Sequence, residues 1–350
     1  MSRTVAWVMV HKKMAPKQLD TSSPLHGRKI GFIGTGAMNG AIIRSLLNTN
    51  HVDASMIYAF DPNTEFLGKV CQETGIHPCS SNNDIISKTN IVVLGTKPQQ
   101  LASVLLESAK ALSEKKDDVL LVSIAAGYKM TTIQEQLESI ANQHKIPLSA
   151  FFKRVRVARV MPNICCTVGE AASAFVLGKT NHISLEQLVL EQDRQCVQTI
   201  FSSIGQCVSL TDESYLDCVT GLSGSGPAYA FMFIEALADG GVYSGLPRET
   251  AILLAAQTVL GAAKMVISEK VSPGVLKDRV MSPAGTTARG VRALGKLLFV
   301  IFRSSLRNRK RRIQRNGDEC CDCWPREKCR IGKTFQVIKQ YFEILKLLLY

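Results

Sequence analysis

Short β-forming runs alternate with longer stretches of helical spacing between residues 29 and 177, and this alternation constrains the fold more than any other feature. The runs expected to be strands are Lys29–Ile33, Met56–Phe60, Ile91–Leu94, Val119–Ile124 and Val155–Val160, with a further one at Ala172–Leu177. Stretches between them, such as Ala37–Leu47 and Gln99–Leu112, have helical spacing. Alternation of this kind is typical of parallel strands joined by helical crossovers. We therefore predict an α/β fold with a doubly wound sheet.

At 350 residues the chain is long enough for two domains. The pattern changes at Ser184, where Ser184-Leu-Glu-Gln187 fits a capping box and Gly205 fits the stop of the helix that follows. We predict an N-terminal extension (1–28), a sheet domain (29–183), an all-helical domain (184–296) and a divergent basic tail (297–350).

Two long helices are expected in the second domain, at Ala228–Leu237 and Ala251–Val266, with Pro227 and Pro247 suited to their first positions. Both are apolar on nearly every face, so they need cover from something else. We expect them to pack against another subunit in a homo-oligomer. No apolar run approaches the roughly 18 residues that a membrane helix needs, so no membrane segment is expected.

The net charge of +13 is concentrated in the tail, where thirteen basic and five acidic residues follow from Leu297. A nucleic-acid partner is therefore not expected for the main surface. The cysteines are scattered, as in reduced intracellular proteins, and the cluster at Cys320–Cys329 lacks a repeated Cys-x-x-Cys pair, so no metal site is expected. Residues 1–19 carry basic but no acidic residues. An unstructured extension and a mitochondrial presequence both fit them, and we expect a cytoplasmic protein with a mitochondrial one as the alternative.

The first predicted strand runs into the glycine turn Lys29-Ile-Gly-Phe-Ile-Gly-Thr-Gly36, just before a predicted helix. In this context Gly34 permits a tight turn, and Gly36 lets the backbone approach a pyrophosphate at the helix N-terminus. The third glycine of the usual pattern is replaced by Asn39, whose side chain is expected to crowd the contact between helix and strand. A purely structural turn is the alternative, but the position favours a Rossmann-type nicotinamide-dinucleotide site.

Other residues at the carboxyl ends of the strands suit the same ligand. Asp61 is placed to accept hydrogen bonds from the adenosine ribose, which favours NAD over NADP, although Asp61-Pro62-Asn63 is also ordinary turn chemistry. Gly95-Thr96-Lys97-Pro98 and Ala125-Ala126-Gly127 leave room for the nicotinamide half. Lys97 by itself is equally typical of a solvated loop.

Two small polar loops open predicted helices in the second half, at Ser223-Gly-Ser-Gly-Pro227 and Ser282-Pro-Ala-Gly-Thr-Thr287. Each is either a simple cap or a holder for a carboxylate, which the free N–H groups of a helix start can bind. No histidine follows His182, so the hydrogen-bond donors of the second domain are expected to be hydroxyls.

From about Lys29 to Leu294 the chain resembles pyrroline-5-carboxylate reductase. Leu222–Phe231 and Ser282–Thr287 carry the resemblance, together with Ile30–Met38 and Val160-Met-Pro-Asn163. It implies reduction of the cyclic imine Δ1-pyrroline-5-carboxylate to L-proline, the last step of proline synthesis, with reduced NADP or NAD as hydride donor. A related hydroxy-acid dehydrogenase is the alternative enzyme, but the helical domain shows no catalytic lysine or histidine.

The resemblance, together with the position at the sheet edge, assigns the site residues. The cofactor would be lined by Ile33, Gly34, Thr35, Gly36, Ala37, Met38, Asp61, Asn82, Gly95, Thr96, Lys97, Pro98, Ala125, Ala126 and Gly127. The substrate would lie at Glu170, Gly285, Thr286 and Thr287. Thr287 would be catalytic, because a hydroxyl at the ring nitrogen stabilises the electron density that hydride addition places there.

Three departures from the family pattern stand out. Ala284 replaces the first of two usual glycines, and Arg279 stands where an uncharged residue is common, which suggests a contact with a cofactor phosphate. Residues 297–350 lack the family's closing helices, and seven cations in Arg303–Arg315 cannot cover an apolar interface. The alternative is thus a variant that binds cofactor but associates weakly and is catalytically impaired. A third reading makes the basic stretch an RNA-binding or targeting segment.

Overall fold

A computed structural model describes residues 19–178 and 191–295 of the chain. The chain divides into two compact units, Met1–Pro227 and Ala228–Tyr350. Several expectations fall outside the described residues: the capping box at Ser184–Gln187, the basic residues before Asp20, and the whole tail from Leu297 with its cysteine cluster.

The first unit contains an eight-stranded sheet in the order β3-β2-β1-β4-β5-β6-β7-β8. Neighbouring strands are parallel except for the antiparallel pair β6 and β7. The strands are β1 (Ile30–Ile33), β2 (Ile57–Phe60), β3 (His77–Pro78), β4 (Ile91–Leu94), β5 (Val119–Ser123), β6 (Val155–Met161), β7 (Ala171–Leu177) and β8 (Gly205–Ser209). The predicted doubly wound α/β domain is confirmed, and each of the six predicted strands is present within two residues at either end.

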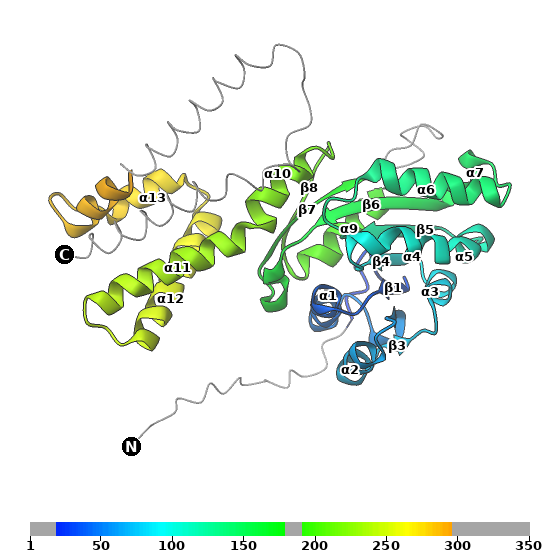
Figure 1. Cartoon of the computed structure of the whole chain (residues 1–350), viewed down its shortest axis with the longest axis horizontal. Coiled ribbons are helices and arrows are strands. Elements are labelled where there is room, and N and C mark those ends of the chain that lie inside the picture. The colour runs from blue at the N-terminus through cyan, green and yellow to red at the C-terminus, as the bar shows by residue number, and fades with distance from the viewer. Residues whose placement is uncertain (1–18, 179–190, 296–350) are drawn as a thin grey trace, which may run out of the picture. The chain divides into compact units, whose positions relative to one another are not determined.

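Helices cover both faces of this sheet (Figure 1). One face carries α1 (Ala37–Asn48), α2 (Thr64–Thr74) and α9 (Glu191–Ser202). The other carries α3 (Asn82–Lys88), α4 (Leu101–Glu107), α5 (Ala109–Glu114), α6 (Met130–Gln143) and α7 (Leu148–Arg154). Short helical turns lie at η1 (Ala54–Met56), η2 (Pro98–Gln100) and η3 (Ile164–Val168), and α10 (Tyr215–Val219) leads into η4 (Thr220–Gly224).

The central strands are buried on both sides, as a parallel sheet between two helical layers requires. In β4, Ile91 and Val93 join the core on one face while Val92 and Leu94 join the core on the other. Local signals set the helix ends: Ser81 caps α3 by accepting a hydrogen bond from the Asp84 N–H.

The sheet extends beyond residue 183, the predicted end of the first domain. Strand β8 pairs with β7, and α9 is tied to β6 because Asp193 and Asp118 both pair with the buried guanidinium of Arg156. The first compact unit accordingly runs to Pro227. β8 was missed because its residues alternate between half-buried and exposed, which leaves no apolar run. Gly205 begins this strand instead of stopping a helix, with φ at +146°, and a Cβ there would come within 2.1 Å of the Ala171 carbonyl oxygen.

The first unit also begins earlier than Lys29. Leu25 is 1% exposed and belongs to the core with α1 and α9, and the Asp20 N–H donates to the Asn50 carbonyl. The part of residues 1–28 that the structure describes is therefore packed against the domain.

The second unit is helical where it is described, with α11 (Gly226–Tyr243) beginning at the boundary, α12 (Arg248–Glu269), α13 (Pro273–Val280) and a helix from Thr286 to the last described residue. Both predicted long helices are confirmed within α11 and α12. These helices pack through small residues: Ala238 lies against Ala251 and Ala255, and a Cβ on Gly241 would come within 3.2 Å of the Ala251 Cβ.

Apolar side chains remain uncovered on α12. Ile252, Leu253, Leu254 and Leu260 are each about half exposed. Among the described helices, α12 alone is long and apolar enough to cross a membrane by length and composition, although no membrane segment was expected. Helices that are buried in soluble assemblies pass the same test. The exposed apolar surface of α12 therefore indicates an interaction site but does not identify the partner.

Candidate active site

The glycine turn after β1 lies against the carboxyl end of β4. Gly34 has φ at +88°, and a Cβ there would come within 3.1 Å of the Gly95 carbonyl oxygen. The Gly95 N–H in turn donates to the Ile33 carbonyl at 2.9 Å. Strands β1 and β4 are neighbours although they are not consecutive, so this is the point where the strand order reverses. Ligands of such sheets bind in the crevice outside the strand ends at that point.

The N-terminus of α1 is exposed to solvent at the same edge of the sheet. Gly36 precedes the helix in an extended conformation, no side chain caps it, and its first turn carries no acidic residue. Gly36 and Ala37 are exposed, and nothing lies within 4 Å of the Cβ position on Gly36. Free N–H groups with the positive end of the helix dipole fit a pyrophosphate.

Asn39 does not crowd the turn, contrary to expectation. Its side chain is 1% exposed, and Nδ2 donates to the carbonyls of Gly34 at 2.7 Å and Ile33 at 3.3 Å. The space it needs is provided by Gly95, whose Cβ position overlaps the Asn39 amide. The missing third glycine is thus compensated on the neighbouring strand.

Asp61 joins the end of β2 to the same turn. Its Oδ2 accepts hydrogen bonds from the Thr35 N–H at 2.6 Å and from Thr35 Oγ1 at 3.1 Å. Its Oδ1 accepts from the Asn63 N–H at 2.8 Å, so the turn role that the sequence allowed is present. The carboxylate remains half-buried beside the turn.

The ends of β4 and β5 supply the remaining cofactor residues. Lys97 is exposed and precedes η2, and Pro98 begins that turn. After β5, Ala125 is buried, while Ala126 and Gly127 are exposed, with open space at the Gly127 Cβ position.

Asn82, at the start of α3 after β3, is 5% exposed and donates through Nδ2 to Glu107 at 2.6 Å. The buried side-chain oxygens without a hydrogen-bond partner in the described part of the chain include Asn82 Oδ1, Thr96 Oγ1 and Asn39 Oδ1. All three belong to residues lining or supporting the predicted cofactor site. Spare hydrogen-bonding capacity there, together with the glycine cradle, fits a bound dinucleotide.

The carboxyl end of β6 holds a residue whose role the sequence did not reveal. Asn163 is 6% exposed; its Oδ1 accepts from the N–H groups of Cys165 and Ala172, and its Nδ2 donates to the Ser223 carbonyl at 2.9 Å. Glu170 follows the η3 turn and is exposed at the start of β7. Since β7 is antiparallel to β6, Glu170 lies at the same sheet edge as the cofactor turns.

In the second unit the predicted substrate residues form the start of one helix. Ser282 accepts a hydrogen bond from the Gly285 N–H at 3.1 Å, and Thr286 and Thr287 begin the helix that follows. Ala284 lies in the left-handed region with φ at +61°, a conformation that favours the glycine of the family pattern. Arg279 pairs with Glu269 on α12, so in this structure its guanidinium is engaged by a carboxylate.

Known proteins match both units. Residues 29–127 match the family model described as NADP oxidoreductase, coenzyme F420-dependent, and residues 213–310 match the model of pyrroline-5-carboxylate reductase dimerisation. A pyrroline-5-carboxylate reductase from Methanosarcina acetivorans is 40% identical over 77% of this chain and 90% of its own length. One from Arabidopsis thaliana is 39% identical over 81% and 92%. The chain belongs to the pyrroline-5-carboxylate reductase family.

Solved structures agree with this membership. The pyrroline-5-carboxylate reductase of Coxiella burnetii superposes with a TM-score of 0.65 at 26% identity, over 92% of this chain and 98% of its own. The Plasmodium falciparum enzyme, solved with NADP bound, gives 0.61 at 26% identity, over 93% and 99%.

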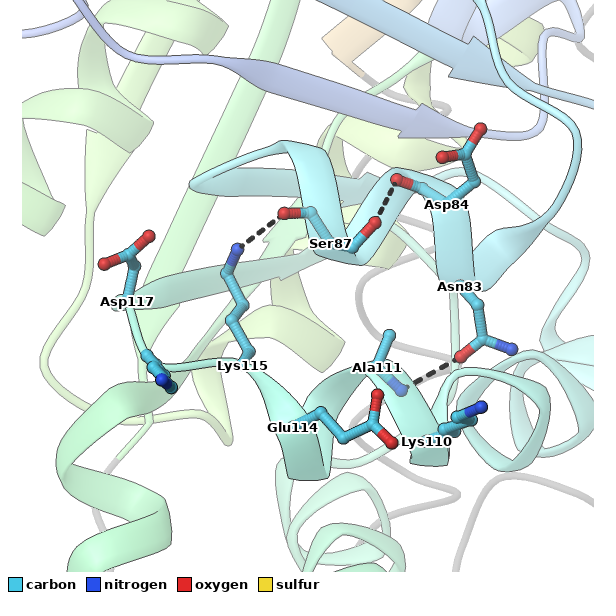
Figure 2. A pocket seen from close by; sticks show the side chains of 9 residues that line it. Asn83, Asp84, Ser87, Lys110, Ala111, Glu114, Lys115 and Asp117 are labelled. Atoms are coloured by element: carbon cyan, nitrogen blue, oxygen red, sulfur yellow. Dashed lines mark hydrogen bonds between the residues drawn. The ribbon is translucent and has the colours of Figure 1, made fainter.

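A separate cavity of about 540 Å³ lies between α3, α5 and the segment that leads into β5. Figure 2 shows Lys115 pointing toward the Ser87 carbonyl, and burial lowers the pKa of this ammonium group. The cavity adjoins the amino end of β5 and reaches along α3 to Asn83, the residue after Asn82 of the predicted cofactor site.

Proposed function

We infer that this chain reduces Δ1-pyrroline-5-carboxylate to L-proline with a reduced nicotinamide dinucleotide. The observation that carries the inference is the 39–40% identity to reductases of that name over about four fifths of the chain. The glycine turn, the open start of α1 and the buried oxygens without partners independently support the dinucleotide.

Residues of the first unit would hold the cofactor. The N–H groups at the start of α1 would bind the pyrophosphate, and the small residues at Gly95 and Ala125–Gly127 would leave space for the nicotinamide ring. The cofactor supplies the hydride when it is bound, and the protein supplies position and electrostatic field.

Residues of the second unit would hold the substrate. The N–H groups of Gly285, Thr286 and Thr287 open a helix, which suits the substrate carboxylate. The Thr287 hydroxyl would hydrogen-bond the ring nitrogen as hydride adds to the imine carbon, and Glu170 completes the proposed substrate residues.

The cofactor preference is proposed to favour NADH. The Asp61 carboxylate lies at the end of β2, where an acidic residue hydrogen-bonds the ribose hydroxyls and repels a 2′-phosphate. The Plasmodium falciparum relative was solved with NADP bound, so both dinucleotides are titrated against this chain.

Turnover by the purified full chain tests the function. Oxidation of NADH and NADPH is followed in the presence of pyrroline-5-carboxylate, with proline identified as product, alongside a titration of each cofactor by nicotinamide fluorescence. Saturable binding together with proline formation is expected. Binding without turnover would establish the impaired variant, and no saturable binding of either cofactor would overturn the proposal.

The match of residues 213–310 to a dimerisation model supports a homo-oligomer, for which we propose a dimer-based assembly. A cytoplasmic location is proposed, with a mitochondrial one as the alternative. Fusing residues 1–28 to a fluorescent reporter distinguishes them, because mitochondrial import of the reporter would overturn the cytoplasmic assignment.

A further inference from the structure

The segment Thr220–Gly224 is not an ordinary helical turn. The Ser225 N–H reaches back five residues to the Thr220 carbonyl at 2.8 Å, which makes η4 a π-helical turn between α10 and α11. Such turns are rare and occur frequently at functional sites. This one contains the first serine and glycine of the Ser223-Gly-Ser-Gly-Pro227 motif and lies within the first unit.

Strand β6 holds this segment at two places. In the second half of the strand, Arg159 pairs with Glu213 at 2.6 Å, just ahead of α10, the helix that leads into the segment. At its end, the Asn163 amide donates to the Ser223 carbonyl, and Met161 packs so closely on Gly224 that a Cβ there would lie 2.7 Å from the Met161 Cε. The motif is thereby fixed at the carboxyl end of β6, next to the strand that ends in Ala125–Gly127.

Asn163 also holds the η3 turn and the start of β7, which lie at the same edge of the sheet. It accepts from the Cys165 N–H as the cap of η3 and from the Ala172 N–H in β7, and Glu170 lies between these two partners. One buried amide therefore holds both the turn that presents Glu170 and the serine-glycine motif. Because this buried amide hydrogen-bonds to the backbone of η3, η4 and β7, it fixes the positions of these three elements relative to one another.

We propose that Asn163 is a positioning residue for imine reduction, which holds the Ser223–Gly224 turn and the Glu170 turn in register at the nicotinamide side of the sheet edge. The proposal rests on the proposed function, because it is the pyrroline substrate that lies against these turns. Misplacement of a reacting group by about 1 Å costs up to roughly a hundredfold in rate. The hydrogen bonds that Asn163 makes with the described residues go to Ser223, Cys165 and Ala172 and to none of the cofactor turns after β1 and β4, so cofactor affinity is expected to depend little on it.

The test is Asn163→Ser in the full chain. Serine retains a side-chain oxygen suited to capping η3, but it is too short to reach the Ser223 carbonyl. The matched control is Gln198→Ser, because the half-buried Gln198 amide on α9 likewise donates to a backbone carbonyl of another element, that of Cys207 in β8 at 2.8 Å, and neither residue belongs to the proposed site.

We expect kcat for pyrroline-5-carboxylate to fall at least about tenfold in Asn163→Ser, with the Kd of the reduced cofactor changed less than about twofold. The deuterium isotope effect from cofactor labelled at the transferred position should rise, since hydride transfer then limits the rate more fully. The control should match the loss in Tm without the loss in kcat. Equal kcat losses in the two variants, or an unchanged kcat in Asn163→Ser, would overturn the proposal.

Hydrogen exchange separates this inference from the proposed function. In Asn163→Ser, the amides of residues 220–226 should exchange at least about tenfold faster, while those of 30–48 stay unchanged. If wild-type chain makes no proline, the proposed function fails and the exchange result still decides whether Asn163 holds the turn. Unchanged exchange at 220–226 would contradict the proposal whatever the activity.

Discussion

The side chain of Asn39 fills the space that a Cβ atom on Gly95 would occupy. Asn39 lies on α1 and Gly95 follows β4, and the Asn39 amide holds the carbonyls of Ile33 and Gly34 in the turn between them. The two residues are therefore coupled: the turn accommodates an asparagine in place of the usual third glycine because the neighbouring strand ends in a glycine.

This coupling predicts a non-additive pair of substitutions. Gly95→Ala should destabilise the chain by about 1–3 kcal/mol, since the methyl group overlaps a buried amide. Asn39→Ala removes that amide, so the double variant should be more stable than the sum of the single effects predicts. Denaturant unfolding of the four proteins measures the coupling. Additive effects would show that the overlap is relieved elsewhere.

A second prediction concerns the choice between the two cofactors. Asp61→Ser removes a negative charge beside the proposed ribose site, and one like charge at about 4 Å is worth about 1 kcal/mol even in water. The ratio of Kd for NADPH to Kd for NADH should therefore fall by about fivefold or more, while the lost bonds to Thr35 weaken both cofactors.

Asp53→Ser is the matched control, because Asp53 also accepts a backbone hydrogen bond at a turn but caps η1 instead of the glycine turn. Its Kd ratio should equal that of the wild type. A ratio that does not move in Asp61→Ser would remove Asp61 from the determinants of cofactor choice and leave it as a turn residue.

The sequence predicts those features whose residues lie close together along the chain, and it misses those that depend on contacts between distant residues. Buried parallel strands are continuous apolar runs, so β1, β4 and β5 are evident, and the glycine turns follow because they come directly after such strands. Strand β3 has two residues and β8 alternates in exposure, so neither carries that signal. The first unit therefore extends to Pro227, well beyond Leu177, where the last apolar run predicted as a strand ends.

The supporting residues were harder to predict than the turns they support. Asn163 bonds to a carbonyl sixty residues away, and Asn39 depends on a glycine in another strand's loop. Their roles arise from tertiary contacts, which spacing does not encode. Asn39 was therefore expected to crowd the turn, and Asn163 stood out only as part of a matching motif.

The third prediction tests the proposed donor in the second unit. Thr287→Val keeps the shape of the side chain and removes the hydroxyl, so it should lower kcat more than it weakens cofactor binding. Loss of one hydrogen bond to a charged group is worth about 1.5–3 kcal/mol, or roughly tenfold to a hundredfold in rate. Steady-state kinetics with cofactor titration measures both quantities. An unaltered kcat in Thr287→Val would show that the Thr287 hydroxyl has no catalytic role.

The fourth prediction concerns the strained residue three positions earlier. Ala284 adopts φ at +61°, which costs a residue with a side chain about 1–2 kcal/mol. Ala284→Gly should therefore stabilise the helical unit by up to about 1 kcal/mol, after the entropy of the added glycine is counted. Ala288→Gly, within the helix, should instead destabilise it by about 0.5–1 kcal/mol. Denaturant unfolding resolves the two signs, and destabilisation by both would place Ala284 outside the left-handed region in solution.

The last prediction concerns the uncovered face of α12. Leu260 is 53% exposed in the single chain and lies within the segment that matches the dimerisation model. If a second copy covers this face, Leu260→Glu buries an unpaired charge, which costs several kcal/mol and should weaken association at least about a hundredfold. Sedimentation over a range of concentrations measures it, with cofactor binding by the first unit as the measure of folding.

Leu106→Glu is the control for that experiment, because Leu106 is 62% exposed on α4 in the first unit and a charge there should leave association unchanged. Sedimentation of the wild-type chain also tests the expectation that residues 297–350 weaken association, because their basic stretch is unsuited to an apolar interface. A homogeneous, active oligomer would show that this tail is compatible with assembly and would contradict the impaired variant. A wild-type monomer with α12 uncovered would instead mean that the interface of the family is not formed by this chain.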